Sequence, residues 1–219
     1  MELHFYPGHD FLAVINTNGH ATYKFEAMGG PREPGTDIRM HEQPTTAGHY
    51  IIDKAHAYTT PSWGVGSKIR WGTPLQDKGN DIWYQLKNGN WASLLNDFGL
   101  PRQDVITAYN EIYNLPDNKI IPKKSIFNDF GPIAIRYFKD LNNNQKLDGK
   151  ETLLGEMFHT TPDNEREYEQ GKKVVLYPSH GCIHLKPADR DTLFGIGAFK
   201  PGTTFIVHKY NERFTGVIK

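Results

Sequence analysis

Hydrophobic and polar positions alternate in short runs at the start of the chain, which predicts β-strands. Between residues 3 and 30, β-branched and aromatic runs are broken by Pro7-Gly8, by Asn16 to Gly19 and by Gly29-Gly30. Turn residues between such runs are typical of β-hairpins. Another apolar run, at 50–52, follows a Pro/Gly turn, so we expect an all-β or mostly β sheet in this part of the chain.

Residues 58–130 have a mixed pattern. Short strands are predicted within 67–76 and 80–89, and the best helix candidate is 97–115, where apolar residues recur at helical spacing. We interpret 58–130 as an α/β insertion or subdomain within a single domain spanning 1–219. Its tryptophans suit either a carbohydrate-binding groove or, more simply, core packing. They are Trp63, Trp71, Trp83 and Trp91.

Strand patterns return after the insertion. Strands are predicted at 131–140 and 152–161, and a third is predicted at 171–181. The charged segment 163–173 looks like an exposed hairpin tip between two of them. A short helix opened by Pro187 and a last strand at 204–208 complete a mostly β fold.

Composition excludes several classes of function. The chain has 219 residues, with 25 Lys plus Arg and 25 Asp plus Glu, so no net charge directs it to nucleic acid. Its apolar runs are too short to cross a bilayer, so membrane insertion is not expected. The first ten residues lack the basic and apolar regions of a signal peptide, which predicts synthesis in the cytoplasm without that signal.

The single cysteine, Cys182, lies in "YPSHGCIHL" at 177–185, and it excludes an internal disulfide or a cysteine-based zinc cluster. A thiolate is a good nucleophile once an imidazole takes its proton, and His159 ends the preceding predicted strand. Two antiparallel strands ending at one rim would bring the two side chains together. A lone cysteine is more often a small buried apolar residue. Ser179 is a weak rival nucleophile, because Tyr177 stands where a serine-hydrolase elbow needs glycine.

The stretch "SHGCIHL", preceded by a strand that ends in "FHTT", resembles the catalytic signature of the L,D-transpeptidase (YkuD-type) family. The segments "YKFEAMGG…QPTTAGHYIID" and "PGTTFIVH" are similar to the family's first half and its last strand. The resemblance covers roughly 1–57 and 131–210. It implies a β-sandwich fold with Cys182 as nucleophile, His159 as general base and the carbonyl of Thr160 orienting the imidazole.

The same resemblance implies roles for the neighbours of the cysteine. The N–H groups of Gly181 and Cys182 would form part of an oxyanion hole, and His180 would shape the substrate pocket. Ser179 would be a local hydrogen-bonding support at the substrate side. His184 stands where the family commonly has arginine or asparagine, so it is a candidate contact for the substrate carboxylate, although imidazole does not replace a guanidinium fork.

The family's substrate is the peptide stem of bacterial peptidoglycan, which lies outside the cytoplasm. We therefore expect an L,D-carboxypeptidase, D-amino-acid exchange or L,D-transpeptidase activity in the periplasm. An antibacterial effector delivered to a target cell by a machine such as type VI secretion is favoured, with an immunity protein and a secretion component as partners. The alternatives are a housekeeping cell-wall enzyme whose leader has been removed, a non-catalytic peptidoglycan-binding module, and a protein-directed cysteine peptidase.

The loop "DLNNNQKLDGKE" at 140–151 has the ligand spacing of a calcium-binding EF-hand loop, although Gln145 stands where glycine is expected. Calcium here would be structural, since the thiol chemistry requires no cofactor, and a plain polar turn is the alternative. The expected ligands at positions 1, 3, 5, 7, 9 and 12 are Asp140, Asn142, Asn144, the Lys146 carbonyl, Asp148 and Glu151.

Overall fold

The chain forms two compact units in the computed structural model. The residues that the structure describes are 1–36, 42–113 and 120–216. The first unit comprises Met1–His56, Ala134–Thr160 and Lys173–Lys219. The second comprises Ala57–Ile133 and Thr161–Lys172. The segment interpreted as an insertion, 58–130, lies in the second unit, and 161–172 joins that unit from a distant part of the sequence.

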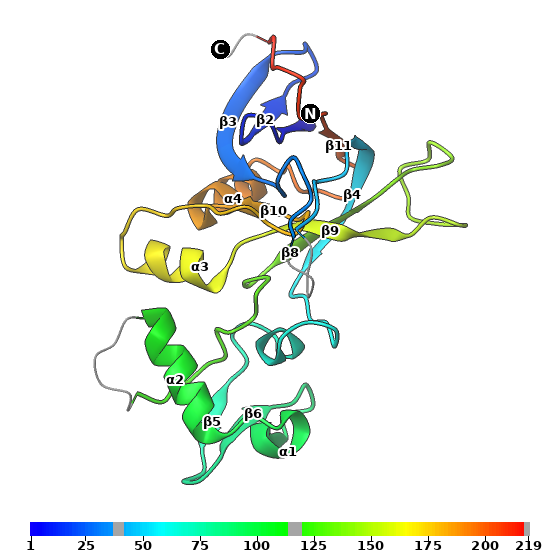
Figure 1. The fold of residues 1–219 in the computed structure, drawn as a ribbon. Coiled ribbons are helices and arrows are strands. Elements are labelled where there is room, and N and C mark those ends of the chain that lie inside the picture. Colours follow the sequence, from blue (N-terminus) through cyan, green and yellow to red (C-terminus); the bar gives the residue numbers. More distant parts are fainter. Residues whose placement is uncertain (37–41, 114–119, 217–219) are drawn as a thin grey trace. The chain divides into compact units, whose positions relative to one another are not determined.

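Strands dominate the first unit. As far as the structure describes it, its strands are β1 (Glu2–Tyr6), β2 (Phe11–Ile15), β3 (Ala21–Met28), β4 (Gly48–His56), β8 (Ala134–Phe138), β9 (Leu153–His159), β10 (Ile183–Leu185) and β11 (Thr204–Val207). They close into a barrel in the order β1-β11-β4-β8-β9-β10-β3-β2 (Figure 1). The predicted mostly β fold is therefore confirmed, with the strands joined in one closed sheet.

Aromatic side chains fill the interior of this barrel. Tyr137, Phe158 and Phe205 come from three different strands, and each is 0% exposed. The ring centroids of Phe158 and Phe205 are 4.7 Å apart, and those of Tyr137 and Phe205 are 4.9 Å apart. Aromatic side chains in such contact contribute both buried area and favourable ring geometry. These ring contacts therefore link β8, β9 and β11 through the core.

Strand β10 pairs in parallel with β9, placing Ile183 opposite Phe158 and His184 opposite His159. Parallel neighbours cannot be joined by a tight hairpin and need a long crossover connection, usually helical. Helix α3 (Pro162–Glu169) lies within that connection. Both the antiparallel arrangement expected for these strands and the hairpin tip expected at 163–173 are therefore wrong.

The sequence before α3 carries a helix start signal that the strand-based interpretation missed. The Thr161 hydroxyl accepts a hydrogen bond from the Asn164 N–H at 3.3 Å, and Pro162 occupies the first turn. Both features are typical of helix N-termini. After α3, residues 172–179 form no strand, so the strand predicted at 171–181 is also wrong. Helix α4 (Pro187–Gly195) begins at Pro187 as predicted.

The second unit has a small sheet and short helices. They are η1 (Val65–Lys68), β5 (Leu75–Asp77), β6 (Ile82–Gln85), β7 (Trp91–Ser93), α1 (Leu94–Phe98) and α2 (Arg102–Tyr113). The strands pair in the order β5-β6-β7, and α2 lies within the predicted helix 97–115. The residues of its buried core are Ile69, Leu75, Ile82, Leu94, Val105 and Ile106. No helix among the described residues is both long and apolar enough to cross a membrane.

The four tryptophans of the second unit are all half-buried rather than enclosed in its core. Trp63 packs against Phe130 with ring centroids 5.6 Å apart, and the Lys78 ammonium lies 5.9 Å from the Trp83 ring. Trp63 and Trp83 thus combine a ring contact with some exposed surface.

Candidate active site

The cysteine lies at the end of a tight loop, directly before β10. Gly181 adopts φ +107°, a backbone conformation that side chains disfavour, and a Cβ there would lie 3.4 Å from the Glu156 side chain. The Ser179 hydroxyl donates to the Cys182 carbonyl and accepts from the Gly181 N–H at 3.1 Å. The Ser179 N–H donates to the Gly29 carbonyl at 3.0 Å. These contacts fix the backbone on both sides of the thiol.

The contacts of Ser179 also bear on its own predicted role and on the role predicted for the Gly181 N–H in an oxyanion hole. Its side chain is only 2% exposed, and its hydroxyl is used within the loop, as a local hydrogen-bonding support would be. A serine nucleophile would need that hydroxyl directed at a substrate. The Gly181 N–H already donates to Ser179, so an oxyanion bound by Gly181 would share or displace this bond.

His159 ends β9 and is held by the backbone that follows it. Its Nδ1 lies 2.9 Å from the Thr160 carbonyl oxygen, and both residues are buried. A carbonyl oxygen only accepts hydrogen bonds, so Nδ1 carries the proton and donates. The lone pair of the neutral imidazole is then on Nε2, which is the tautomer that a general base requires.

The parallel register brings the thiol and this imidazole to neighbouring positions. Because Ile183 is opposite Phe158, Cys182 falls opposite Met157, whose backbone N–H donates to the sulfur. With this register extended by one residue, Cys182 and His159 are offset by two residue positions, about 7 Å along and about 5 Å across the sheet. Side chains of this size can meet across such an offset.

His184, another predicted site residue, contacts His159. Its ring packs edge to face on the His159 ring, with centroids 4.7 Å apart, and its Nδ1 lies 2.8 Å from the Tyr177 carbonyl. Because His184 contacts the predicted base, its position suits support of that imidazole as well as substrate contact. His180 is exposed on the same loop, so a molecule approaching the thiol can reach its side chain.

Burial keeps the thiol and the imidazole neutral. It raises the pKa of Cys182 to about 11, and the nearby Glu156 carboxylate adds to the rise, while the Met157 N–H and Arg136 oppose it. Burial also lowers the pKa of His159 to about 3, with a further contribution from His184, while the hydrogen bond with Thr160 opposes this. A thiolate is therefore favoured only when a substrate brings its own compensating interactions.

Glu156 is a site residue that the sequence analysis missed. Its carboxylate accepts hydrogen bonds from the Thr46 N–H at 3.2 Å, from the Thr46 hydroxyl at 2.6 Å and from the Tyr137 hydroxyl at 3.2 Å. Burial raises its pKa. Two segments distant in sequence supply these groups, so no local pattern indicates them. A single polar residue on a strand would ordinarily be assigned to the solvent face.

The predicted calcium loop, 140–151, lies outside the segments that carry His159, Cys182 and His184. The Asp140 carboxylate accepts from the Asn144 and Gln145 N–H groups at 3.3 and 2.8 Å, and Gln145 has φ +59°, the conformation for which glycine was expected. Glu151 accepts from the Leu141 N–H at 2.7 Å. In the part of the chain that the structure describes, no three His, Cys, Asp or Glu side chains are grouped to hold a metal. Calcium binding stays a prediction.

These observations define a candidate acyl-transfer site, with a thiol beside an oriented imidazole, in a mostly β protein. The profile of the L,D-transpeptidase catalytic domain family (YkuD) matches residues 6–207. The chain therefore belongs to this family. A comparison with curated proteins gave no match.

Among solved structures, the chain is similar to an L,D-transpeptidase (residues 123–326) from Xylanimonas cellulosilytica, with a TM-score of 0.39 and 9% identity. The similarity covers 94% of this chain and 59% of that one, so this chain spans less than two thirds of its length.

Replacing Glu156 with Gln should make Cys182 more reactive, because the negative charge that raises the thiol pKa is removed. We expect alkylation by iodoacetamide at pH 8 to become about threefold to tenfold faster, while the wild-type rate keeps rising with pH toward about 11. Mass spectrometry of the alkylated protein measures both rates. Thr46→Val removes hydrogen bonds to Glu156 but keeps its charge, and Glu33→Gln removes an exposed charge. An unchanged or slower rate in Glu156→Gln would contradict this electrostatic role.

If the loop 140–151 binds calcium in the weak range of ~10⁻⁴–10⁻³ M, about 10 mM calcium should raise Tm by about 3–8 °C. Differential scanning fluorimetry with and without calcium measures the shift. The variant Asp140→Ala plus Glu151→Ala should not respond, and magnesium at the same concentration controls for ionic strength. Equal Tm values for the wild type with and without calcium would show that the loop is only a polar turn.

Proposed function

We propose that this protein cleaves or exchanges the terminal D-amino acid of peptidoglycan stem tetrapeptides through a thioester on Cys182. The observation that carries the proposal is the pairing of β9 with β10. This pairing puts Cys182 two residue positions from His159 on the neighbouring strand, and the His159 Nδ1 donates to the Thr160 carbonyl. Membership of the L,D-transpeptidase family supports peptidoglycan as the substrate class.

In the first half-reaction, the sulfur attacks the carbonyl carbon at the L-centre of the third stem residue, and His159 Nε2 takes the thiol proton. The carbonyl oxygen becomes an oxyanion that the N–H groups of Cys182 and Gly181 stabilise. The C–N bond to the terminal D-alanine then breaks, and the imidazolium gives its proton to the departing amine. The result is a thioester and free D-alanine.

In the second half-reaction, an acceptor attacks the thioester and releases the thiolate. Water gives L,D-carboxypeptidase hydrolysis, a free D-amino acid gives exchange, and the amine of another stem gives a cross-link. His159 takes the proton from the acceptor and returns it to the sulfur. His180 and His184 line the approach of the stem, and Ser179 keeps the cysteine loop in position. The balance between products depends on how well water is excluded.

Cys182→Ala should abolish release of D-alanine from tetrapeptide muropeptides while leaving the fold intact, because it removes the nucleophile and little volume. His159→Ala should lower kcat by at least ~10²-fold, the usual scale of general acid–base catalysis. Mass spectrometry of the products measures activity, and thermal unfolding checks stability. His49→Ala, an exposed histidine of β4, is the matched control. Continued D-alanine release by Cys182→Ala would contradict the mechanism and favour a role confined to peptidoglycan binding.

We also propose that the protein acts in the periplasm as an antibacterial effector, with an immunity protein and a secretion-machine component as partners. The location of the proposed substrate supports this setting. Expression in the cytoplasm should be tolerated, whereas fusion to an export signal should damage the producing cell. Viable counts and microscopy measure the effect. Exported Cys182→Ala should be harmless. Normal growth with the active exported form would instead favour a housekeeping cell-wall enzyme.

A further inference from the structure

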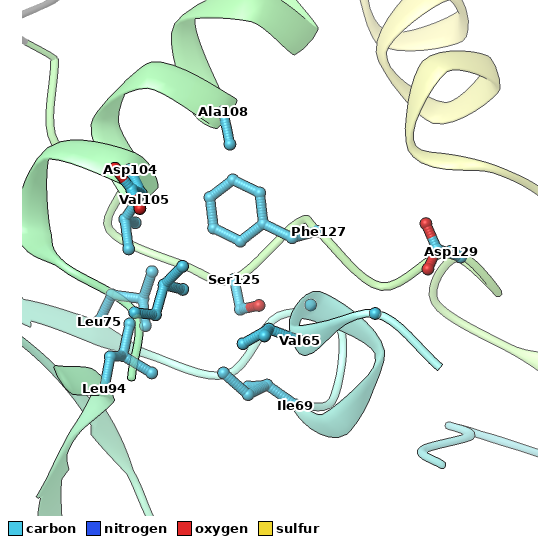
Figure 2. A pocket seen from close by; sticks show the side chains of 13 residues that line it. Val65, Ile69, Leu75, Leu94, Asp104, Val105, Ala108, Ser125, Phe127 and Asp129 are labelled. Atoms are coloured by element: carbon cyan, nitrogen blue, oxygen red, sulfur yellow. The ribbon is translucent and has the colours of Figure 1, made fainter. Parts of the chain in front are cut away.

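The second unit contains a hollow of about 200 Å³, entirely within its own residues. It lies between η1, α2 and the segment 125–129, and Figure 2 shows its labelled side chains. Four members of the unit's core, Ile69, Leu75, Leu94 and Val105, form part of the wall. The hollow is partly open, so a small molecule can enter it.

A buried hydroxyl within this wall has no hydrogen-bond partner among the residues that the structure describes. It belongs to Ser125, which is 0% exposed. Its backbone is fixed, because the Ser125 N–H donates to the Thr73 carbonyl at 2.8 Å and its own carbonyl accepts from the Gly72 N–H at 2.7 Å. Figure 2 shows the hydroxyl among Val65, Ile69 and Phe127. A buried polar group without a partner is costly, so this hydroxyl suits a ligand that can donate to it or accept from it.

The charges at this hollow narrow the choice of ligand. Its charged lining residues are Asp104 and Asp129, both acidic. One Asp129 oxygen already accepts from the Ser67 hydroxyl at 2.7 Å. An anion would be repelled by both carboxylates and would lose its hydration against the apolar wall. The remaining lining is mainly aliphatic, with Phe127 as its aromatic member.

We propose that this hollow is a binding site for a small uncharged molecule with a compact aromatic or branched aliphatic body and one hydroxyl or carbonyl group, which hydrogen-bonds to Ser125. The size is appropriate, since an apolar cavity of about 150 Å³ in another protein holds benzene. The ligand would bind and stabilise the second unit. The site is independent of the thiol chemistry proposed for Cys182, so either proposal can fail without the other.

Phenol, benzene and benzoate test this site on the full chain. We expect phenol to bind about fivefold more tightly than benzene, because one good hydrogen bond contributes about 1 kcal/mol and 1.4 kcal/mol corresponds to a factor of ten. Benzoate, the anion, should bind least. Ligand-observed NMR titration gives the affinities, and Tm measured with each compound reports stabilisation. Failure of both phenol and benzene to bind would show that the hollow is only a packing defect.

Two variants test whether phenol and benzene bind in this hollow. Ser125→Ala should bring phenol and benzene to equal affinity, and it should leave Tm of the free protein unchanged or higher because no buried partner is lost. Ala108→Leu places extra volume next to Phe127 and should abolish binding of both compounds. A phenol preference that persists in Ser125→Ala, or binding that survives Ala108→Leu, would overturn the proposal.

Discussion

The parallel pairing of β10 with the last residues of β9 is the constraint on which the candidate active site depends. It places Cys182 against the Met157 N–H and His184 beside His159. An antiparallel partner would direct the chain away from the end of β9 and would separate these residues. The aromatic interior beneath β8, β9 and β11 keeps the register fixed, since a slip of one residue would turn the buried Phe158 outward.

The sequence indicated the parts of the site more reliably than their arrangement. Local alternation identified most strands of the barrel, and the Ser-His-Gly-Cys stretch with an upstream histidine identified the family. The antiparallel neighbour predicted for β9 at 171–181 was wrong, because strand polarity depends on the connection and the helix signal at Thr161-Pro162 was overlooked. Glu156 could not be found from its neighbours, because Thr46 and Tyr137 contact it from other strands and loops. Such tertiary contacts leave no periodic signal in the chain.

The protonation of the site follows from its burial. A neutral thiol and a neutral imidazole are the forms that a dry environment favours, and Glu156 strengthens this preference at the sulfur. A resting thiolate would react with many electrophiles. A neutral thiol reacts only after a base has removed its proton. The raised pKa of Cys182 predicts a slow reaction with free electrophiles.

The path of the chain through the two units limits how the protein can be divided. The second unit takes 161–172 from the segment between His159 and Cys182, and α3 contacts α2 through the Tyr113 hydroxyl, which donates to Glu169 at 2.7 Å. Arg166 donates to the Ile112 carbonyl in the same contact. A deletion of 58–130 alone would leave α3 without these partners, in the middle of the segment between His159 and Cys182. The second unit therefore cannot be removed by deleting one continuous segment. Recombination between relatives would have to exchange Ala57–Ile133 and Thr161–Lys172 together.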